Sequence, residues 1–462
     1  MPAEDVAALL WAPRAWLPEG WRERVLLRIG ADGCWAEVTP DVAAPPAGAE
    51  CLGGPLLPGV VNAHSHAFQR AFAGRAERRE EASDDFWSWR ERMYRVALRI
   101  SPAQLRAVAA QLYVELLRGG YTHVCEFHYL QHDRDGQPYA DPLAMSWALA
   151  DAAADAGIGL TILPVLYERA GFADSALRSD QRRFGLSAEG VVDAAAQIAA
   201  SGRPRVNSGL AIHSLRGASP ASIAALDRLA EGTAVSIHIH VSEQTAEVDD
   251  CLRTTGLRPI EWLAREGRID ARWQLVHATH ATPAEIESVA ASGAGLVLCP
   301  STEANLGDGL ADLPGWLAAG VPLTVGSDSH AGRDWREELR WLEYGQRLAL
   351  RRRNVAAAPE QGRPSTAERL FADVVAAGAV AAGLPAWGLT AGARADAAIV
   401  DTGADALLGL APLETIDALV FSSPSATWQD VLVAGRWVLR DGRHAASAEI
   451  AERFVAAMRE IS

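Results

Sequence analysis

The stretch LLPGVVNAHSH (56–66) decides the fold. It is an apolar run that ends in two histidines, and seven similar runs follow it, separated by alanine-rich segments with a helical pattern. These runs are YTHVCEFH (121–128), IGLTILPVLY (158–167), VNSGLAIHS (206–214), AVSIHIHVSE (234–243), WQLVHATH (273–280), AGLVLCP (294–300) and LTVGSDS (323–329). Eight such strand–helix units within roughly 300 residues predict an α/β fold, a closed (β/α)8 TIM-like barrel. An open doubly wound sheet is the alternative, but no GxGxxG motif follows the first strand.

The two ends of the chain have a different pattern. Short apolar runs near the N-terminus are broken by prolines, and TWQDVLVAGRWVLRDG (427–442) predicts a hairpin with Ala434-Gly435 at its turn. The ends could form two unrelated caps. The more specific prediction is that residues 1–55 and 385–462 pair into one small β-sandwich-like domain formed from both chain termini, and that residues 56–384 form the catalytic barrel.

Composition excludes several classes of protein. With 49% hydrophobic and 22% charged residues the chain can bury a sizeable core, so general disorder is excluded. No run reaches the ~18 apolar residues of a membrane span and no signal peptide precedes the first domain, which favours a cytoplasmic protein without a membrane partner. The net charge of −15 disfavours nucleic acid as a partner.

Two residue types exclude particular chemistries. The five cysteines form no CxxC pair, so neither a disulfide framework nor a cysteine zinc knuckle is expected. The sequence contains no lysine, which excludes Schiff bases and metal bridges made by a carbamylated lysine. An anionic substrate would therefore have to be held by arginine.

Histidines gather at one place in the predicted barrel. Nine of the 12 lie at or just beyond the C-terminal ends of predicted strands, where barrel active sites are built. They are His64, His66, His128, His213, His238, His240, His277, His280 and His330. Such a concentration predicts a site at the mouth of the barrel.

The first and fifth strands each carry an HxH pair. Residues two apart on a strand point to the same face, so His64 and His66 can reach one metal ion. At the fifth strand either His238 or His240 could be a ligand. Glu243 lies three residues beyond His240 and could exchange a proton near a metal, which favours His240.

The sixth and eighth strands add two more candidates. His277 and His280 compete at the end of the sixth strand, and His277 is favoured because it is embedded in the strand. Asp328 leaves the eighth strand within GSDSH, where it is either a helix cap or an anionic metal ligand that can accept a proton from water.

Together these residues resemble the metal site of the amidohydrolase superfamily, in particular its deaminases with one divalent metal. The resemblance covers nearly the whole chain. It implies that His64, His66, His240 and Asp328 hold the metal, with Glu243, His277 and Asp328 as catalytic residues. Because lysine is absent, one metal is expected; three nitrogens and one carboxylate suit Zn²⁺, and Fe²⁺ or Mn²⁺ could use the same ligands.

Further stretches resemble the N-formimidoyl-L-glutamate deiminase family of histidine degradation. They are NAHSHAFQRAFAGRAE (62–77), FWSWRERMY (86–94), GYTHVCEFHYLQH (120–132), AIHSLRG (211–217), HIHVSEQ (238–244) and EELRWLEYGQRL (337–348). The resemblance implies that Arg90 and Arg216 grip the two carboxylates of the substrate, helped by Tyr129 and His213, with Gln69 beside the reacting group. Arg90 depends on a loop that folds over the site.

The family implies hydrolytic deimination: water attacks the formimino carbon, Glu243 delivers a proton to the departing nitrogen, and ammonia and N-formyl-L-glutamate result. It also implies a homodimer. N-formimidoyl-L-aspartate is an alternative substrate, since the sequence does not show whether the pocket fits a side chain that is one methylene shorter. A heterocyclic amine is another, although two converging arginines suit a flat ring poorly. A noncatalytic barrel scaffold is the alternative from another class, but such a protein would be expected to lose metal ligands.

Overall fold

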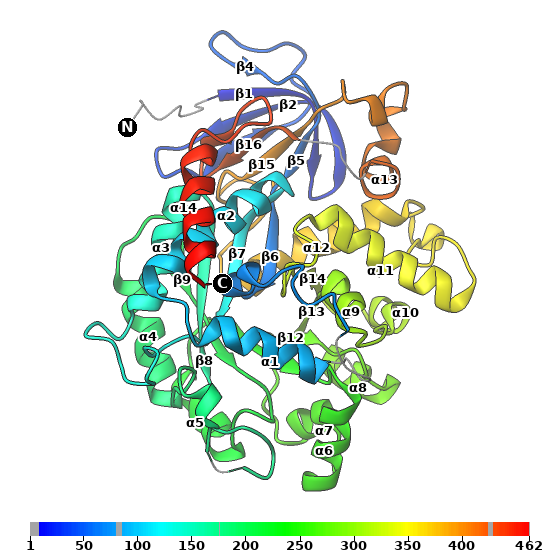
Figure 1. Ribbon diagram of the computed structural model, residues 1–462. Coiled ribbons are helices and arrows are strands. Elements are labelled where there is room, and N and C mark those ends of the chain that lie inside the picture. Colours follow the sequence, from blue (N-terminus) through cyan, green and yellow to red (C-terminus); the bar gives the residue numbers. More distant parts are fainter. Residues whose placement is uncertain (1–8, 80–85, 175, 424–427, 462) are drawn as a thin grey trace.

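The computed structural model describes residues 9–79, 86–174, 176–423 and 428–461, and within them the strands form two sheets surrounded by helices (Figure 1). The larger sheet is parallel and runs in the order β14-β13-β12-β11-β10-β8-β7-β6, with β9 beside β8. Its strands are β6 (Val60–Ser65), β7 (Tyr121–His128), β8 (Gly159–Leu166), β9 (Val206–Ser208), β10 (Leu210–Ile212), β11 (Ile237–Val241), β12 (Trp273–His277), β13 (Gly295–Leu298) and β14 (Leu323–Val325).

The first and last strands of this sheet meet. A bridge joins Ser65 to Asp328, where the Asp328 amide donates to the His64 carbonyl at 3.0 Å and the His66 amide donates to the Asp328 carbonyl at 3.2 Å. The barrel therefore closes at the point where the predicted metal ligands of the first and eighth strands lie. The predicted (β/α)8 barrel is confirmed.

The stretch 56–66 is two strands rather than the single strand expected. It divides at Gly59: β5 (Leu56–Pro58) pairs with strands of the smaller sheet, and β6 enters the barrel. A Cβ at Gly59 would lie 2.1 Å from Thr122 Oγ1, so only glycine fits this change of sheet. The stretch that decides the fold thus also joins its two sheets.

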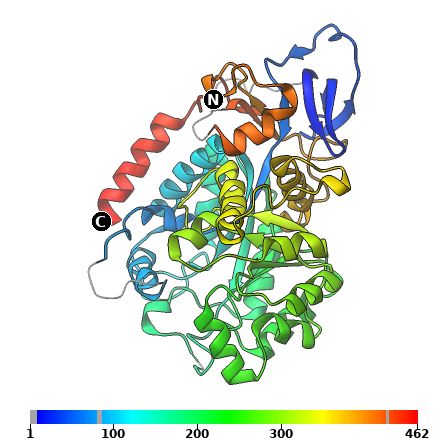
Figure 2. The same ribbon diagram turned by 90° about the vertical axis from the view of Figure 1, so that its right-hand side faces the viewer.

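Most of the helices cover the outside of the barrel, and the first one lies across its mouth (Figure 1 and Figure 2). In chain order they are α1 (Phe86–Ala97), α2 (Pro102–Arg118), α3 (Ala144–Ala156), α4 (Ala188–Ala200), α5 (Pro220–Leu229), α6 (Thr245–Thr255), α7 (Pro259–Arg265), α8 (Pro283–Ser292), α9 (Pro300–Leu306), α10 (Leu313–Ala319), α11 (Trp335–Leu350), α12 (Thr366–Ala382), α13 (Thr415–Phe421) and α14 (Ser447–Ile461). Several of these helices begin at a capping residue that can be recognised in the sequence. At α2, for example, Ser101 accepts a hydrogen bond from the Gln104 amide and Pro102 occupies the first turn.

The smaller sheet combines both ends of the chain. Its strands run in the order β17-β16-β15-β5-β1-β2-β3, with β4 beside β1. They are β1 (Leu9–Leu17), β2 (Gly20–Ile29), β3 (Trp35–Thr39), β4 (Glu50–Cys51), β5, β15 (Ala397–Val400), β16 (Trp428–Val433) and β17 (Arg436–Leu439). The expected β structure from both termini is confirmed. Its strands are hydrogen-bonded in one continuous order, and the sandwich-like form of the domain stays a prediction.

The predicted hairpin joins β16 to β17. Ala434 and Gly435 both have positive φ, 49° and 76°, as a two-residue turn of type I′ requires; Thr427 of the predicted segment lies outside the described residues. Division of the chain into units at 55/56 and 384/385 stays a prediction, although β5 already belongs to the smaller sheet.

The C-terminal helix α14 lies against α2 and α3 on the outside of the barrel (Figure 1). Gln104 Nε2 donates to Glu460 at 2.8 Å, and Arg453 lies 3.3 Å from Asp155. The C-terminal segment therefore contributes more than strands, since its last helix covers part of the barrel. None of the described helices combines the length and apolar content that crossing a membrane would need.

Candidate active site

Three histidines and one aspartate converge where the barrel closes. His64 Nε2 lies 3.1 Å from His66 Nε2, 3.0 Å from His240 Nε2 and 3.5 Å from Asp328 Oδ1. His66 Nε2 lies 3.4 Å from the same carboxylate oxygen. All four side chains are buried: His64 lies in β6, His66 directly follows β6, His240 lies in β11 and Asp328 follows β14.

The protonation of these imidazoles fits a bound cation. His66 Nδ1 donates to the Phe127 carbonyl and His240 Nδ1 donates to the His213 carbonyl, each at 2.9 Å. Burial lowers the pKa of His64, His66 and His240, so each ring is neutral and the Nε2 atoms of His66 and His240 carry lone pairs. These lone pairs face His64 Nε2, which can donate to only one of them, and a carboxylate oxygen lies beside them.

A divalent cation among these nitrogen and oxygen atoms would bind their lone pairs and so remove the repulsion between them. In a tetrahedral zinc site with bonds of about 2.0–2.1 Å, neighbouring ligand atoms lie about 3.3 Å apart, close to the separations found here. The hydrogen bonds that orient His66 and His240 are also typical of metal-ligating histidines. The residues present fit a divalent metal ion.

The backbone around this cluster is held in an unusual conformation. Positive φ angles occur at non-glycine residues at or just after the ends of three barrel strands: Ser242 (52°), His277 (70°), Ala278 (47°), Asp328 (45°) and His330 (66°). Such strain persists where surrounding contacts fix the chain, and it gathers at functional sites.

Close packing between β6 and the end of β14 also fixes the cluster. A Cβ at Gly326 would lie 2.6 Å from His64 Cβ and 2.8 Å from the His64 carbonyl oxygen, so glycine is required there. Asn62 binds Ser327 twice: its amide nitrogen donates to Ser327 Oγ at 2.7 Å and its oxygen accepts from the Ser327 amide at 2.9 Å. His64 and Asp328 are thereby held face to face.

A second group of titratable side chains adjoins the cluster. His277 Nε2 lies 3.7 Å from Glu243 Oε1 and 3.8 Å from Asp328 Oδ2. Burial raises the pKa of Glu243 to about 7, which lets this carboxyl both take up and release a proton near neutral pH. Burial opposes protonation of His277, but the carboxylates around it outweigh burial and raise its pKa to about 10.

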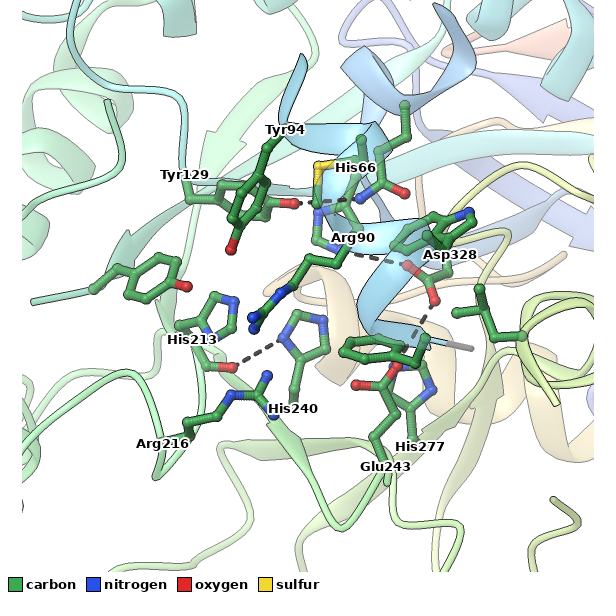
Figure 3. A pocket seen from close by; sticks show the side chains of 16 residues that line it. His66, Arg90, Tyr94, Tyr129, His213, Arg216, His240, Glu243, His277 and Asp328 are labelled. Carbon is green, nitrogen blue, oxygen red and sulfur yellow. Dashed lines mark hydrogen bonds and ion pairs between the residues drawn. The ribbon is translucent and has the colours of Figure 1, made fainter. Parts of the chain in front are cut away.

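Two arginines occupy the opposite side of the same pocket (Figure 3). Arg90 comes from α1, which lies over the barrel mouth, and Arg216 follows β10. Arg90 Nε and Arg216 Nη1 are buried and have no hydrogen-bond partner among the described residues. Burial and the neighbouring Arg216 lower the pKa of Arg90. Two cationic side chains with buried, unpartnered nitrogens in one pocket are suited to an anionic ligand.

The remaining sequence candidates line this pocket, which holds about 530 Å³ of empty space including its open mouth. Gln69 Nε2 donates to the Tyr129 hydroxyl at 3.2 Å, and Gln69 Oε1 is buried without a partner among the described residues. The His213 ring stacks on Tyr167 with centroids 3.9 Å apart. These polar groups thus line the same pocket as the metal cluster and the arginines.

The competing histidines lie elsewhere. His238 Nε2 donates to the Ala381 carbonyl at the end of α12, at 2.8 Å, and His280 is not among the residues that line the pocket. Cys299 lies near His277 and Asp328, but burial raises the pKa of its thiol and keeps it from the thiolate form that binds metals.

Sequence reasoning missed Glu303, a buried residue of α9. Its Oε1 accepts a hydrogen bond from His277 Nδ1 at 3.2 Å. The sequence signal is weak, because a glutamate in the first turns of a helix is common. Only the arrangement of the seventh strand beside the sixth brings Glu303 to His277.

The class of protein follows from the family comparison. The sequence model of the amidohydrolase family matches residues 56–438. The chain therefore belongs to this family of metal-dependent hydrolases. The match spans the barrel and extends to β17 in the smaller sheet.

Particular relatives narrow the comparison. Formimidoylglutamate deiminase of Pseudomonas aeruginosa is 48% identical over 455 residues, which cover 98% of this chain and 99% of that protein. The crystal structure of an amidohydrolase from Brucella melitensis has a TM-score of 0.92 and 41% identity and covers 98% of this chain and 99% of its own. An adenosine deaminase from Xanthomonas campestris, solved with bound zinc, shares the fold at 22% identity, with a TM-score of 0.79 over 100% of this chain and 99% of its own.

Proposed function

We propose that this chain is a hydrolytic deiminase that converts N-formimidoyl-L-glutamate and water to N-formyl-L-glutamate and ammonia, a step of histidine degradation. The observation that carries the proposal is the pairing, in one pocket, of a site fit for a metal with two arginines, Arg90 and Arg216. Each has a buried nitrogen without a hydrogen-bond partner among the described residues. Nearly full-length similarity to a formimidoylglutamate deiminase supports it.

One divalent ion, Zn²⁺ by preference, would be held by His64, His66, His240 and Asp328. When bound, such an ion lowers the pKa of water toward ~7 and so supplies a nucleophile near neutral pH. Fe²⁺ and Mn²⁺ accept the same nitrogen and carboxylate donors.

Three side chains of the protein would orient the water molecule and transfer its protons. His277 and Asp328 lie 3.8 Å apart and are placed to orient a water molecule between them and the formimino carbon. Glu243, with its pKa raised to about 7, is placed to take a proton from that water. It then gives this proton to the formimino nitrogen as the new C–O bond forms. The second proton of the water leaves the hydroxyl as the formyl C=O forms, and Glu243 carries it to the same nitrogen, so that the C–N bond breaks and NH3 leaves.

The glutamate portion would lie across the arginine side of the pocket. Arg90 and Arg216 can each bind a carboxylate through two parallel hydrogen bonds. Tyr129 and His213 would add hydrogen bonds, and Gln69 would contact the formimino group through its unpartnered Oε1. A flat uncharged ring would leave Arg90 Nε and Arg216 Nη1 buried without a hydrogen-bond acceptor, which disfavours a heterocyclic amine.

The experiment is an ammonia-release assay on zinc-loaded enzyme with N-formimidoyl-L-glutamate and its aspartate homologue, the product being identified by mass. We expect ammonia and N-formylglutamate in equal amounts, with the aspartate homologue turned over more slowly. Protein stripped of metal is the control and should be inactive. Absence of ammonia from both substrates with metal-replete protein would contradict the proposal.

We also propose that the enzyme is a cytoplasmic homodimer. Support for both comes from its family resemblance to metabolic deiminases rather than from a contact in this single chain. Sedimentation equilibrium should give twice the 49.2 kDa mass of one chain, and a mass of one chain would contradict the dimer.

A further inference from the structure

His277 reaches the pocket from a backbone that does not by itself fix its ring. Residues 277 and 278 have φ of 70° and 47°, so the chain leaves the regular geometry of β12 at the histidine. The ring stacks on His240 with an interplanar angle of 12°, which holds its plane. Stacking does not distinguish the ring from one rotated by 180°, in which carbon and nitrogen positions are exchanged.

Glu303 supplies the missing constraint. Its Oε1 lies 3.2 Å from His277 Nδ1, and both side chains are buried. A carboxylate oxygen only accepts hydrogen bonds, so it requires a proton on Nδ1 and excludes the rotated ring, which would present a C–H group instead. Nε2 is then directed at Glu243 and Asp328, at 3.7 and 3.8 Å.

The carboxylate of Glu303 is itself held in place. Its Oε1 also accepts from the Cys299 amide at 2.9 Å, at the point where β13 ends and α9 begins. The N-terminal end of a helix favours a negative charge. Glu303 therefore extends from a rigid element toward the imidazole rather than from a loop.

We propose that Glu303 is a positioning residue for the reaction: the hydrogen bond that it accepts from His277 Nδ1–H fixes the orientation of the imidazole that faces the substrate. The inference rests on the proposed function, and it adds a carboxylate–imidazole pair behind the residues that the resemblance implies. Orienting partners of this kind affect activity by about 10- to 100-fold when removed from metal sites.

The competing explanation is that Glu303 only stabilises the start of α9. Glu338 provides a matched control, because it is buried and supports the same helix start without touching His277. Its Oε2 accepts from the Ser301 amide at 2.9 Å and its Oε1 accepts from Ser301 Oγ at 2.6 Å. Removing Glu338 should weaken the helix start as much as removing Glu303.

The test compares Glu303→Ala, Glu303→Gln and Glu338→Ala by kcat, KM, metal content and Tm. We expect Glu303→Ala to lower kcat by about 10- to 100-fold with KM within about twofold and full metal content. Glu303→Gln keeps an oxygen that can accept both hydrogen bonds, so its kcat should stay within about fivefold of the wild type. Glu338→Ala should lower Tm with a smaller loss of kcat.

A double-mutant cycle tests whether Glu303 acts through His277. In the His277→Ala background, adding Glu303→Ala should leave the residual kcat unchanged. Four results would each overturn the proposal: wild-type kcat in Glu303→Ala, an equal kcat loss in Glu338→Ala, an equal loss in Glu303→Gln, or the same loss with His277 absent.

Nitrogen NMR of protein labelled with ¹⁵N-histidine gives a measurement that needs no substrate. Wild-type protein should show a protonated Nδ1 at His277, assigned by its loss in His277→Ala, and Glu303→Ala should change that signal. An unchanged signal would overturn the proposal. If wild-type enzyme releases no ammonia from N-formimidoyl-L-glutamate, the proposed function fails while this spectrum still decides on Glu303.

Discussion

Glu243 lines the pocket beside His277, and burial raises the pKa of its carboxyl to about 7. Glu243→Gln keeps its size but can neither accept nor deliver the proton, so we predict a fall in kcat of at least about 10²- to 10⁴-fold. Metal should remain bound, as measured by elemental analysis, because the four proposed ligands are untouched. Retained turnover in this variant would remove Glu243 from its proposed role.

Arg216 and Arg90 should determine substrate affinity rather than the rate of the chemical step. Arg216→Gln removes a charged hydrogen-bonding group worth about 1.5–3 kcal/mol, so KM should rise by roughly 10- to 150-fold. Arg178 is the control: it is outside the pocket lining and pairs with Asp180 at 2.7 Å, and Arg178→Gln should change KM little. Equal KM values for the two variants would contradict the assignment of Arg216.

The close contact between the end of β14 and β6 allows a prediction about the packing of two strands. Gly326→Ala would place a methyl group within 2.9 Å of backbone and side-chain atoms of His64, which must then move. We expect lower metal content, a kcat loss that parallels it, and destabilisation of about 1–3 kcal/mol. Gly392→Ala is a useful control, because nothing lies within 4 Å of its Cβ position and its cost is limited to its positive φ. Full metal occupancy in Gly326→Ala would contradict this view of the contact.

Sequence patterns predicted the barrel strands well because each is an apolar run that ends in polar residues. The histidines at those ends could be assigned to one mouth, and the choice of His240 over His238 agrees with their positions in the barrel. The division at Gly59 was not predictable, because the Thr122 side chain that enforces it lies on another strand. Glu303 was missed for the same reason: its partner belongs to a different strand–helix unit, and nothing local marks the contact.

Considered as one molecule, the protein carries many histidines that are buried in neutral form. Burial lowers the pKa of His128 and His330 to about 3 and that of His238 to about 4. Below pH 6.5 these histidines bind protons in the unfolded chain but stay neutral in the folded protein. Their contribution to the free energy of unfolding therefore falls as pH decreases from 6.5 toward the pKa values of the folded state. At pH 5 each such histidine costs about 2 kcal/mol of unfolding free energy.

Buried carboxyls act in the opposite direction, because burial raises the pKa of Glu126 to about 7 and that of Glu338 to about 8. We therefore predict the effect of one histidine rather than the net change in Tm. His238→Gln can still donate to the Ala381 carbonyl but cannot titrate, so between pH 7.5 and pH 5 the wild type should lose about 2 kcal/mol of stability relative to this variant. Scanning calorimetry of both proteins at the two pH values measures this. A difference in Tm between the two proteins that is the same at both pH values would show that His238 does not limit stability in acid.

The central claim is that this assembly of distant residues adds one water molecule to a formimino carbon and expels ammonia. Turnover of N-formimidoyl-L-glutamate in H₂¹⁸O, followed by mass spectrometry of the product, measures this step directly. The account predicts N-formylglutamate with one ¹⁸O in its formyl group and one ammonia for each molecule formed. A product without the heavy oxygen, or no product at all from zinc-loaded enzyme, would contradict it.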